Sequence, residues 1–283
     1  MRPPTPPSGS RPLSFGCVPH TDDLETRAIL GELCRALTDK VRATVRSHRA
    51  PSPALLASAF GAGRIDVAWV SPVLLLTAEG MRDAIPLVSA VREGVASYHA
   101  VLFTAADSPL RSPSDLVRAR AAWVAKTSAA GYLVPRLALA ARGLRPDEIF
   151  AREEFLDSHG AVARAVLEGE ADVGATFAVF EEADPTRPLV AAGFDGVPGG
   201  SARVLLSAGP IPADLMVARP DITITQRAAL TTAFESLPED AVASSAALHL
   251  FGTDSFRRFE SGALDPLRED VQAGRVLGLL GDD

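Results

Sequence analysis

The chain has 283 residues, 47% of them apolar, and a formal net charge of −7 at pH 7. This length and apolar fraction predict two domains of moderate size, each with its own core. The negative charge and the lack of any Lys/Arg run exclude nucleic acid as a partner, because binding a phosphate backbone requires a basic surface. No apolar run approaches the roughly 20 residues needed to span a bilayer.

Residues 1–10 are rich in proline and have no apolar core, so we expect a short disordered lead and not a secretory signal. Only two cysteines follow, Cys17 and Cys34, which are too few for a disulfide framework or a structural zinc site. We expect buried free thiols. The sequence leaves a single disulfide between them open.

Short apolar runs alternate with helical patterns in the first part of the chain. Strands are expected at 13–19, 41–47 and 65–70, and helices at 23–40 and 53–60. This β-α-β-α-β order predicts a parallel sheet with helices on both faces. In such sheets, ligands bind at the carboxyl ends of the strands.

Ser71 stands at one such strand end, directly before Pro72. A Ser followed by Pro is a good N-cap and first helical residue, and this structural role explains the pair by itself. The Ser71 hydroxyl and the N–H groups behind it can also face a ligand. Both roles can hold at once, so Ser71 is a candidate binding residue.

The same alternation returns after residue 104. Helices are expected at 112–118, 130–142 and 158–168, and strands at 121–125, 151–156 and 172–177. The predicted fold class is therefore α/β with two lobes, each a mostly parallel sheet flanked by helices.

Two extended segments, 98–104 and 202–207, predict the crossings between the lobes. Lobe 1 is then discontinuous and consists of residues 11–103 and 204–283, whereas lobe 2 is continuous and consists of residues 104–203. Helices expected near 226–237, 241–250 and 265–273 pack back on lobe 1 in this scheme.

The turn after the strand at 121–125 has the composition of an anion site, with the small residues Thr127 to Ala130 opening a helix. Such a turn leaves several backbone N–H groups without partners at one spot, and the helix dipole adds about half a positive charge there. That spot suits an anion. The candidate ligands are Ser128, Ala129 and Ala130.

Two further side chains can contact an oxyanion. His159 follows Ser158, an ordinary N-cap, and can donate to an anion oxygen, although local backbone can equally satisfy it. Asp214, as a buried carboxylate, can accept from an oxyanion that still carries a proton or from a ligand amine. It can equally cap the loop after Pro212.

Several short motifs follow one another at a characteristic order and spacing, namely Ser114–Leu116, the Ser128 turn, Gly131–Pro135, Ser158–His159, Gly169–Gly174 and Ile211–Asp214. These motifs resemble the phosphate/phosphite/phosphonate family of ABC-transporter substrate-binding proteins, which have the periplasmic-binding-protein fold of type 2. The resemblance implies a receptor that closes two lobes on a small oxyanion and presents it to an ABC permease. It also implies that Tyr98 lines the ligand cleft, although an aromatic residue on a strand is most often part of a core.

Several positions depart from the family pattern. Ala129 and Ala130 replace hydroxyl residues, which removes side-chain donors but leaves the backbone donors. Pro53 stands where the family often has a Tyr, and Gly160 follows the Ser-His pair in place of Asp. These departures concern the ligand and not the fold.

The sequence contains no nucleophile elbow, Walker loop, His-Glu-x-x-His motif or dinucleotide glycine fingerprint. The adjacent pairs Glu153-Glu154 and Glu181-Glu182 diverge on a strand or helix, so we expect solvated surface and not acid/base pairs. No catalytic residue, metal or cofactor is expected.

We therefore expect a monomeric substrate-binding component for phosphonate, phosphite or phosphate, extracytoplasmic by the resemblance. A cytosolic ligand sensor of the same fold is one alternative, favoured by the missing export signal. An enzyme on this fold, like those of the menaquinone futalosine route, is another. Upstream coding sequence with an apolar h-region would separate the first two hypotheses, and a turnover assay would separate the third.

Overall fold

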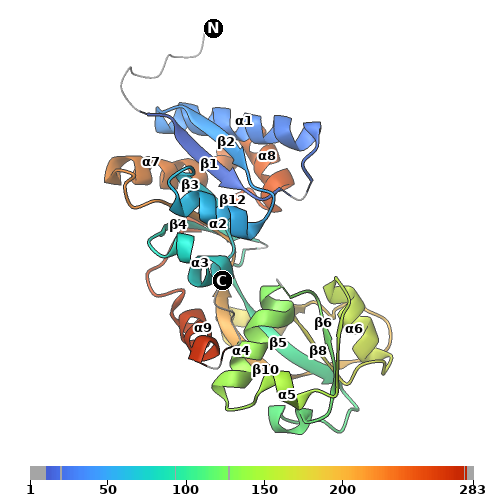
Figure 1. Ribbon diagram of the computed structural model, residues 1–283. Coiled ribbons are helices and arrows are strands. Elements are labelled where there is room, and N and C mark those ends of the chain that lie inside the picture. The colour runs from blue at the N-terminus through green and yellow to red at the C-terminus, as the bar shows by residue number, and fades with distance from the viewer. Residues whose placement is uncertain (1–10, 20, 93, 127, 277, 279–283) are drawn as a thin grey trace. The chain divides into compact units, whose positions relative to one another are not determined.

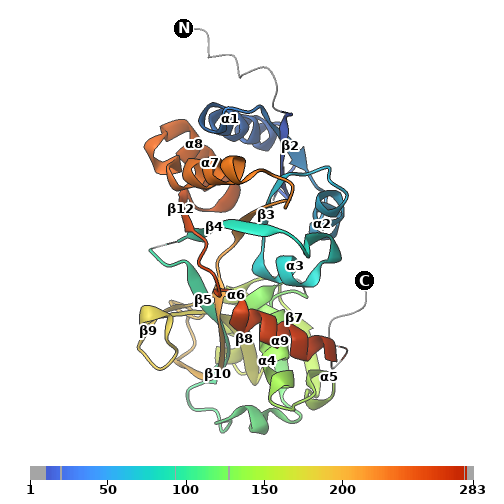
Figure 2. The ribbon, with the colours of Figure 1, turned by 90° about the vertical axis from the view of Figure 1, so that its left-hand side faces the viewer.

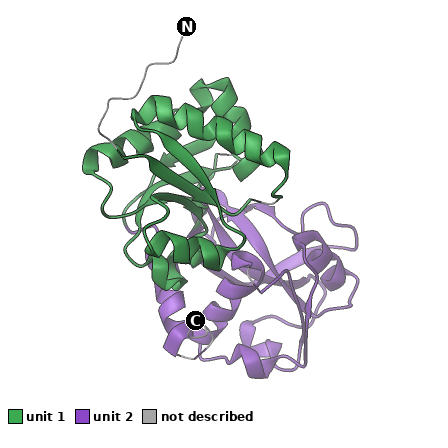
Figure 3. Cartoon of the chain, turned by 45° about the horizontal axis from the view of Figure 1, so that its top comes forward, with its two compact units in different colours: residues 1–96, 212–261 green, residues 97–211, 262–283 purple. Residues whose placement is uncertain are grey.

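The computed structural model describes residues 11–19, 21–92, 94–126, 128–276 and 278 (Figure 1). The expected disordered lead at 1–10 and Thr127 of the anion turn lie outside the described residues. The chain divides into two compact units, each made of two segments (Figure 3). Unit 1 comprises residues 1–96 and 212–261, and unit 2 comprises residues 97–211 and 262–283.

The first two crossings between the units lie at the ends of two long strands. Strand β5 (Ser97–Ala105) begins at the first crossing, and β10 (Ala202–Pro212) ends at the second. The boundaries expected at 103/104 and 203/204 fall inside these strands. Because β5 and β10 are neighbours in one sheet, their pairing keeps both strands in unit 2.

A third crossing, at Ser261–Gly262, places residues 262–283 in unit 2 and not in lobe 1 as expected. There, α9 (Asp265–Val276) packs against α4 (Val134–Ala141) (Figure 2). The buried face of α9 includes Leu267 and Val271. The periodicity of apolar residues predicted this helix, but it does not indicate which of the two units the apolar face of the helix packs against.

Unit 1 is built on a six-stranded sheet in the order β12-β4-β11-β3-β1-β2. Its strands are β1 (Leu13–Cys17), β2 (Val45–Arg49), β3 (Val67–Val70), β4 (Ile85–Val91), β11 (Leu215–Ala218) and β12 (Ser255–Arg258). Its helices are α1 (Leu24–Val41), α2 (Pro53–Gly61), α3 (Pro72–Thr77), α7 (Ile224–Glu235) and α8 (Ala241–Phe251), with short 3-10 turns η1 (Glu79–Met81) and η5 (Leu237–Glu239). In its core, the ring of Phe15 contacts Phe234 and Phe251, with centroids 6.4 and 6.2 Å away.

The first helix has the length that the sequence suggested but begins and ends one residue later. Asp23 caps α1 by accepting from the Thr26 N–H at 2.7 Å, and Arg42 ends it in the left-handed conformation with φ of 53°. The helix runs to Val41, so strand β2 begins at Val45 and not at residue 41.

Unit 2 contains a sheet in the order β10-β5-β8-β6-β7, with β9 paired to β8. Its remaining strands are β6 (Arg120–Trp123), β7 (Arg152–Phe155), β8 (Val173–Phe180) and β9 (Leu189–Ala192). Its remaining helical elements are η2 (Pro113–Leu116), η3 (Ala129–Leu133), α5 (Pro146–Ile149), α6 (His159–Leu167) and η4 (Glu181–Ala183). Helix α6 packs so closely on β8 that a Cβ at Gly174 would lie 2.7 Å from Val162 Cγ1.

The predicted α/β class with two sheets flanked by helices is confirmed, but each sheet is mixed and not mostly parallel. β1 is parallel to β2 and β3, and β6 is parallel to β7 and β8. β11 is antiparallel to β3 and β4, and β5 and β9 are antiparallel to β8. The parallel strands still bring their carboxyl ends to one edge of each sheet.

Cys17 and Cys34 are free and buried, and burial raises the pKa of each thiol to about 12. The disulfide that the sequence left open is therefore not formed. In the described part of the chain, none of the helices combines the length and apolar character needed to cross a membrane.

Candidate functional site

Ser128 caps the turn that leads from β6 into α4. Its Oγ accepts a hydrogen bond from the Gly131 N–H at 3.1 Å, and its own N–H donates to Ala125 O at 2.9 Å. The helix begins with the π-turn η3, in which the Val134 N–H donates to Ala129 O. Such π-turns are rare and occur frequently at functional sites.

Gly131 lets this turn lie directly on the end of β6. A Cβ at residue 131 would lie 2.4 Å from Val124 Cγ2, and the Val124 N–H donates to Gly131 O at 3.1 Å. Any side chain here would push the turn away from the strand. The close approach therefore requires glycine.

The N–H groups of Ala129 and Ala130 have no hydrogen-bond partner among the residues that the structure describes. Both residues lie in the first helical turn, where the helix itself supplies no acceptor, and the Ser128 Oγ accepts from Gly131 instead. Ala130 is buried, whereas Ala129 is partly exposed. The two alanines thus offer backbone donors at the positive end of a helix, where the sequence predicted an anion.

His159 is the first residue of α6, directly after the cap Ser158, whose Oγ accepts from the Ala161 N–H at 3.2 Å. Its Nδ1 lies 2.9 Å from the Thr176 Oγ1 of β8, so a side chain and not local backbone satisfies it. Its ring meets the ring of Phe177 edge-on, with centroids 5.2 Å apart. Burial lowers the pKa of His159, which favours the neutral imidazole at neutral pH.

Tyr98 lies half-buried near the start of β5. β5 pairs with β8 from Gly174 to Ala178, with His99 opposite Ala178, whereas β6 pairs with β8 only at Val173 and Gly174. Tyr98 therefore lies beyond the carboxyl end of β6. The same edge of the unit 2 sheet carries Ser128 and His159.

Ser71 and Asp214 belong to unit 1, whereas the other candidate residues belong to unit 2. Ser71 caps α3 as expected, with its Oγ accepting from the Leu74 N–H at 3.2 Å. The Asp214 side chain is 33% exposed and forms an ion pair with Arg92 at 3.0 Å. Asp214 is therefore not the buried carboxylate that the sequence analysis assumed.

A buried arginine behind the turn was not predicted. The Arg136 side chain of α4 is 8% exposed, forms ion pairs with Asp147 and Glu153, and lies 5.0 Å from the ring centroid of Tyr132. Glu153 is exposed, as expected, but it also accepts a hydrogen bond from Trp123 Nε1 at 2.7 Å, which the sequence did not predict. The only signal in the sequence was a charged residue on the inner face of an apolar helix.

Thr176 was also missed. It is fully buried in β8 and contacts His159. The sequence showed only a threonine within the apolar run Val173–Phe180. Threonine is common in strands, so its presence there predicts no specific role.

Two α/β units, each with a mixed sheet whose parallel strands end at one edge, are the architecture of two-lobed solute-binding proteins. Residues 15–262 match the model of the family described as ABC transporter, phosphonate, periplasmic substrate-binding protein. The chain belongs to this family, which confirms the resemblance found in the sequence. Its members are binding components of transporters and not enzymes, as the sequence analysis expected.

Solved structures show the same fold at low identity. The Xanthomonas citri protein XAC2383, bound to ATP, has 22% identity and a TM-score of 0.70, covering 96% of this chain and 100% of that one. A binding protein component of an ABC phosphonate transporter from Pseudomonas aeruginosa has 19% identity and a TM-score of 0.60, covering 97% and 90%. PhnD1 from Prochlorococcus marinus, in complex with methylphosphonate, has 16% identity and a TM-score of 0.60, covering 95% and 98%.

Proposed function

We propose that this protein is the substrate-binding component of an ABC transporter for a small phosphorus oxyanion, namely a phosphonate, phosphite or phosphate. The observation that carries the proposal is the pair of unpartnered N–H groups of Ala129 and Ala130, within the described residues, behind the Ser128 cap. Two oxyanion oxygens accept from these groups in the proposed complex. The Ser128 hydroxyl, whose oxygen already accepts from Gly131, donates its proton to the same anion.

The side chains at the same sheet edge complete the proposed site. His159 and Tyr98 donate from the ends of α6 and β5. Ser71 and Asp214 stay proposed ligand residues of unit 1. Asp214 can serve in this way only if it exchanges part of its ion pair with Arg92 for a ligand proton or amine.

The ligands of two proteins with the same fold support this ligand class. PhnD1 was solved with methylphosphonate and XAC2383 with ATP. Both ligands carry oxygens bonded to phosphorus, which is the group that the Ala129 and Ala130 donors would hold. In this function the protein acts as a monomer in the periplasm and delivers its ligand to an ABC permease.

Thermal-shift screening with phosphate, phosphite, methylphosphonate, aminoethylphosphonate and ATP tests the ligand class. A ligand that binds only the folded chain stabilises it by about 2.7 kcal/mol at one hundred times its dissociation constant. We expect at least one of the four small phosphorus oxyanions to raise the melting temperature. A shift with ATP alone, or with an uncharged or aromatic compound alone, would contradict the proposal.

The variant Ser128→Ala tests the location of the site. Losing a hydrogen bond to a charged ligand costs about 1.5–3 kcal/mol, so affinity should fall roughly ten- to a hundredfold by calorimetric titration. Ser112→Ala is the matched control, because Ser112 caps η2, which precedes the amino end of β6 in the same unit. Equal losses in both variants would show that a lost cap, and not a ligand contact, is responsible.

A further inference from the structure

We propose that Thr176 is a positioning residue that fixes His159 in the tautomer with its proton on Nε2, so that the ring presents a neutral N–H donor to the oxyanion. The role in binding rests on the proposed function. The tautomer itself is a property of the chain without ligand, so the two ideas can fail separately.

The Thr176 hydroxyl is enclosed by neighbouring residues of unit 2 and has no access to solvent. Thr176 is fully buried, and within the described chain its hydroxyl has one hydrogen-bond partner, the His159 Nδ1 at 2.9 Å. Gly193 covers the hydroxyl from the segment after β9. A Cβ there would lie 2.0 Å from Thr176 Oγ1 and 3.1 Å from His159 Cβ, so no side chain can fit between them.

Two proton arrangements are compatible with this contact, and they differ in what they leave unpaired. If the Thr176 hydroxyl donates, Nδ1 accepts and the ring proton resides on Nε2. If Nδ1–H donates instead, the buried hydroxyl proton has no acceptor among the described residues. An unsatisfied donor in a buried position costs its full desolvation energy, so the first arrangement is favoured.

Other contacts keep the ring in place. The Ser158 cap fixes the first turn of α6, and Phe177 meets the His159 ring edge-on at an interplanar angle of 86°. A ring held on one side by Thr176 and on another by Phe177 cannot flip to exchange its two nitrogens without breaking the buried hydrogen bond. His159 is thereby pre-organised as a donor, which lowers the cost of ordering it when ligand binds.

All the proposed donors to the anion are electrically neutral. Ala129 and Ala130 offer backbone N–H groups, Ser128 offers a hydroxyl, and His159 offers a neutral ring N–H. All of these donors are dipoles that need no proton uptake to bind an anion. Thr176 contributes by donating to Nδ1, which keeps the ring proton on Nε2, the nitrogen on the side of the ring away from Thr176.

Long-range ¹H–¹⁵N correlation spectra of the imidazoles test the tautomer directly in the unliganded protein. The chain has five histidines, and the signal lost in His159→Asn identifies the relevant ring. We expect Nδ1 unprotonated and Nε2 protonated in the wild type and in Thr176→Ser, and a mixture of tautomers in Thr176→Val. Thr104→Val is the matched control, because Thr104 is a buried strand threonine of the same unit whose hydroxyl donates to Asp172 O.

A wild-type His159 with its proton on Nδ1, or with averaged tautomers, would overturn the inference without any variant. An unchanged Nε2–H tautomer in folded Thr176→Val would overturn it as well. Methylphosphonate titration then tests the role in binding: Thr176→Val should weaken affinity about three- to tenfold, as expected for one neutral hydrogen bond, with Thr176→Ser restoring it. If no phosphorus oxyanion binds the wild type, the proposed function fails while the spectra still decide the tautomer.

Discussion

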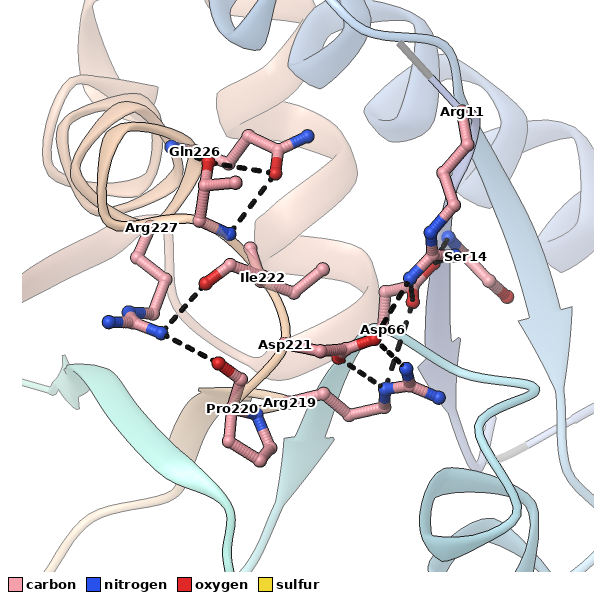
Figure 4. A network of polar contacts seen from close by, with 10 residues as sticks. Arg11, Ser14, Asp66, Arg219, Pro220, Asp221, Ile222, Gln226 and Arg227 are labelled. Carbon is pink, nitrogen blue, oxygen red and sulfur yellow. Dashed lines mark hydrogen bonds and ion pairs between the residues drawn. The ribbon is translucent and has the colours of Figure 1, made fainter.

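At the scale of single residues, Asp66 joins the amino ends of two strands of unit 1 (Figure 4). Its side chain is 2% exposed and accepts hydrogen bonds from the Arg11 guanidinium at 2.6 and 3.1 Å and from the Ser14 N–H at 2.8 Å. Arg219, which also pairs with Asp221, lies 4.0 Å away. A buried carboxylate with these partners ties residue 11 and β1 to the start of β3.

We expect Asp66→Asn to destabilise unit 1 by about 1.5–3 kcal/mol, because a neutral amide with one acceptor oxygen cannot replace both carboxylate oxygens that accept from Arg11 and Ser14. Urea denaturation measures the change. Asp221→Asn is the control, since the Asp221 side chain is 53% exposed and a surface ion pair contributes at most about 1 kcal/mol. Because Asp66 lies at the sheet edge opposite Ser71, ligand affinity should be unchanged. Equal destabilisation by both variants would contradict this reading of the network.

The residues that act locally were predictable, and those that act through distant partners were not. Ser71 and Ser158 were recognised as helix caps from the residues beside them, and each is one. The contacts of Asp214 with Arg92 and of His159 with Thr176 join residues far apart in the chain. Spacing along a sequence carries no information on such pairs until the sheet order is known.

At the scale of elements, strand-to-helix turns in both units share one construction. Ser52 and Ser71 cap α2 and α3 in unit 1, and Ser128 and Ser158 cap η3 and α6 in unit 2. Each cap satisfies one N–H and leaves the earlier ones available. The Ser128 turn differs in its π-turn and in its close contact with β6 through Gly131.

Gly131→Ala should destabilise unit 2 by about 1–3 kcal/mol and displace the proposed anion donors, because the new methyl group overlaps Val124. Thermal unfolding and methylphosphonate titration measure the two effects. Gly160→Ala is the matched control in α6, where a Cβ meets nothing within 4 Å and helix propensity favours alanine by about 1 kcal/mol. A Gly131→Ala protein as stable as Gly160→Ala would disprove the close approach.

Element types were more predictable than element ends and partners. The strands flanking the Ser128 and His159 turns lie where periodicity placed them, within one or two residues. The helix expected at 112–118 is only the short turn η2, because Val117 leaves the helical region with ψ of 120°. The mixed sheets were missed, since local alternation shows that a strand exists but not the direction of its neighbour.

At the scale of the whole molecule, α9 links the end of the chain to the helix that carries the Ser128 turn. It packs on α4 within unit 2, and Asp270 of α9 is partly buried there. Burial raises the pKa of the Asp270 carboxyl to about 6, while Arg142 lowers it and Glu269 raises it further. The charged carboxylate is therefore disfavoured in the folded state.

The sign of the pH dependence follows from this shift. The folded-state pKa lies above the ordinary value of 3.8, so the contribution of Asp270 to stability is complete below about pH 4 and is lost as pH rises through 6. Asp270→Asn should raise the melting temperature at pH 7.5 and flatten its change between pH 5 and 7. Glu170→Gln, an exposed carboxylate elsewhere in unit 2, is the control. An Asp270→Asn protein with the wild-type pH profile would refute the assignment.

We also expect ligand to draw the two units together by hinge motion at the crossings, because a ligand stabilises the state in which it makes more contacts. Small-angle scattering with saturating methylphosphonate should give a smaller radius of gyration than without it. An unchanged radius at saturation would exclude closure.

The third crossing also sets the order in which the protein can finish folding during synthesis. Unit 1 needs residues 212–261, which leave the ribosome after most of unit 2, and unit 2 needs α9, which is made after all of unit 1. Domains usually fold as units in the order of translation. Here neither unit is a continuous stretch of chain, so a product truncated within α9 lacks part of unit 2, and the two units can both be complete only once α9 has left the ribosome.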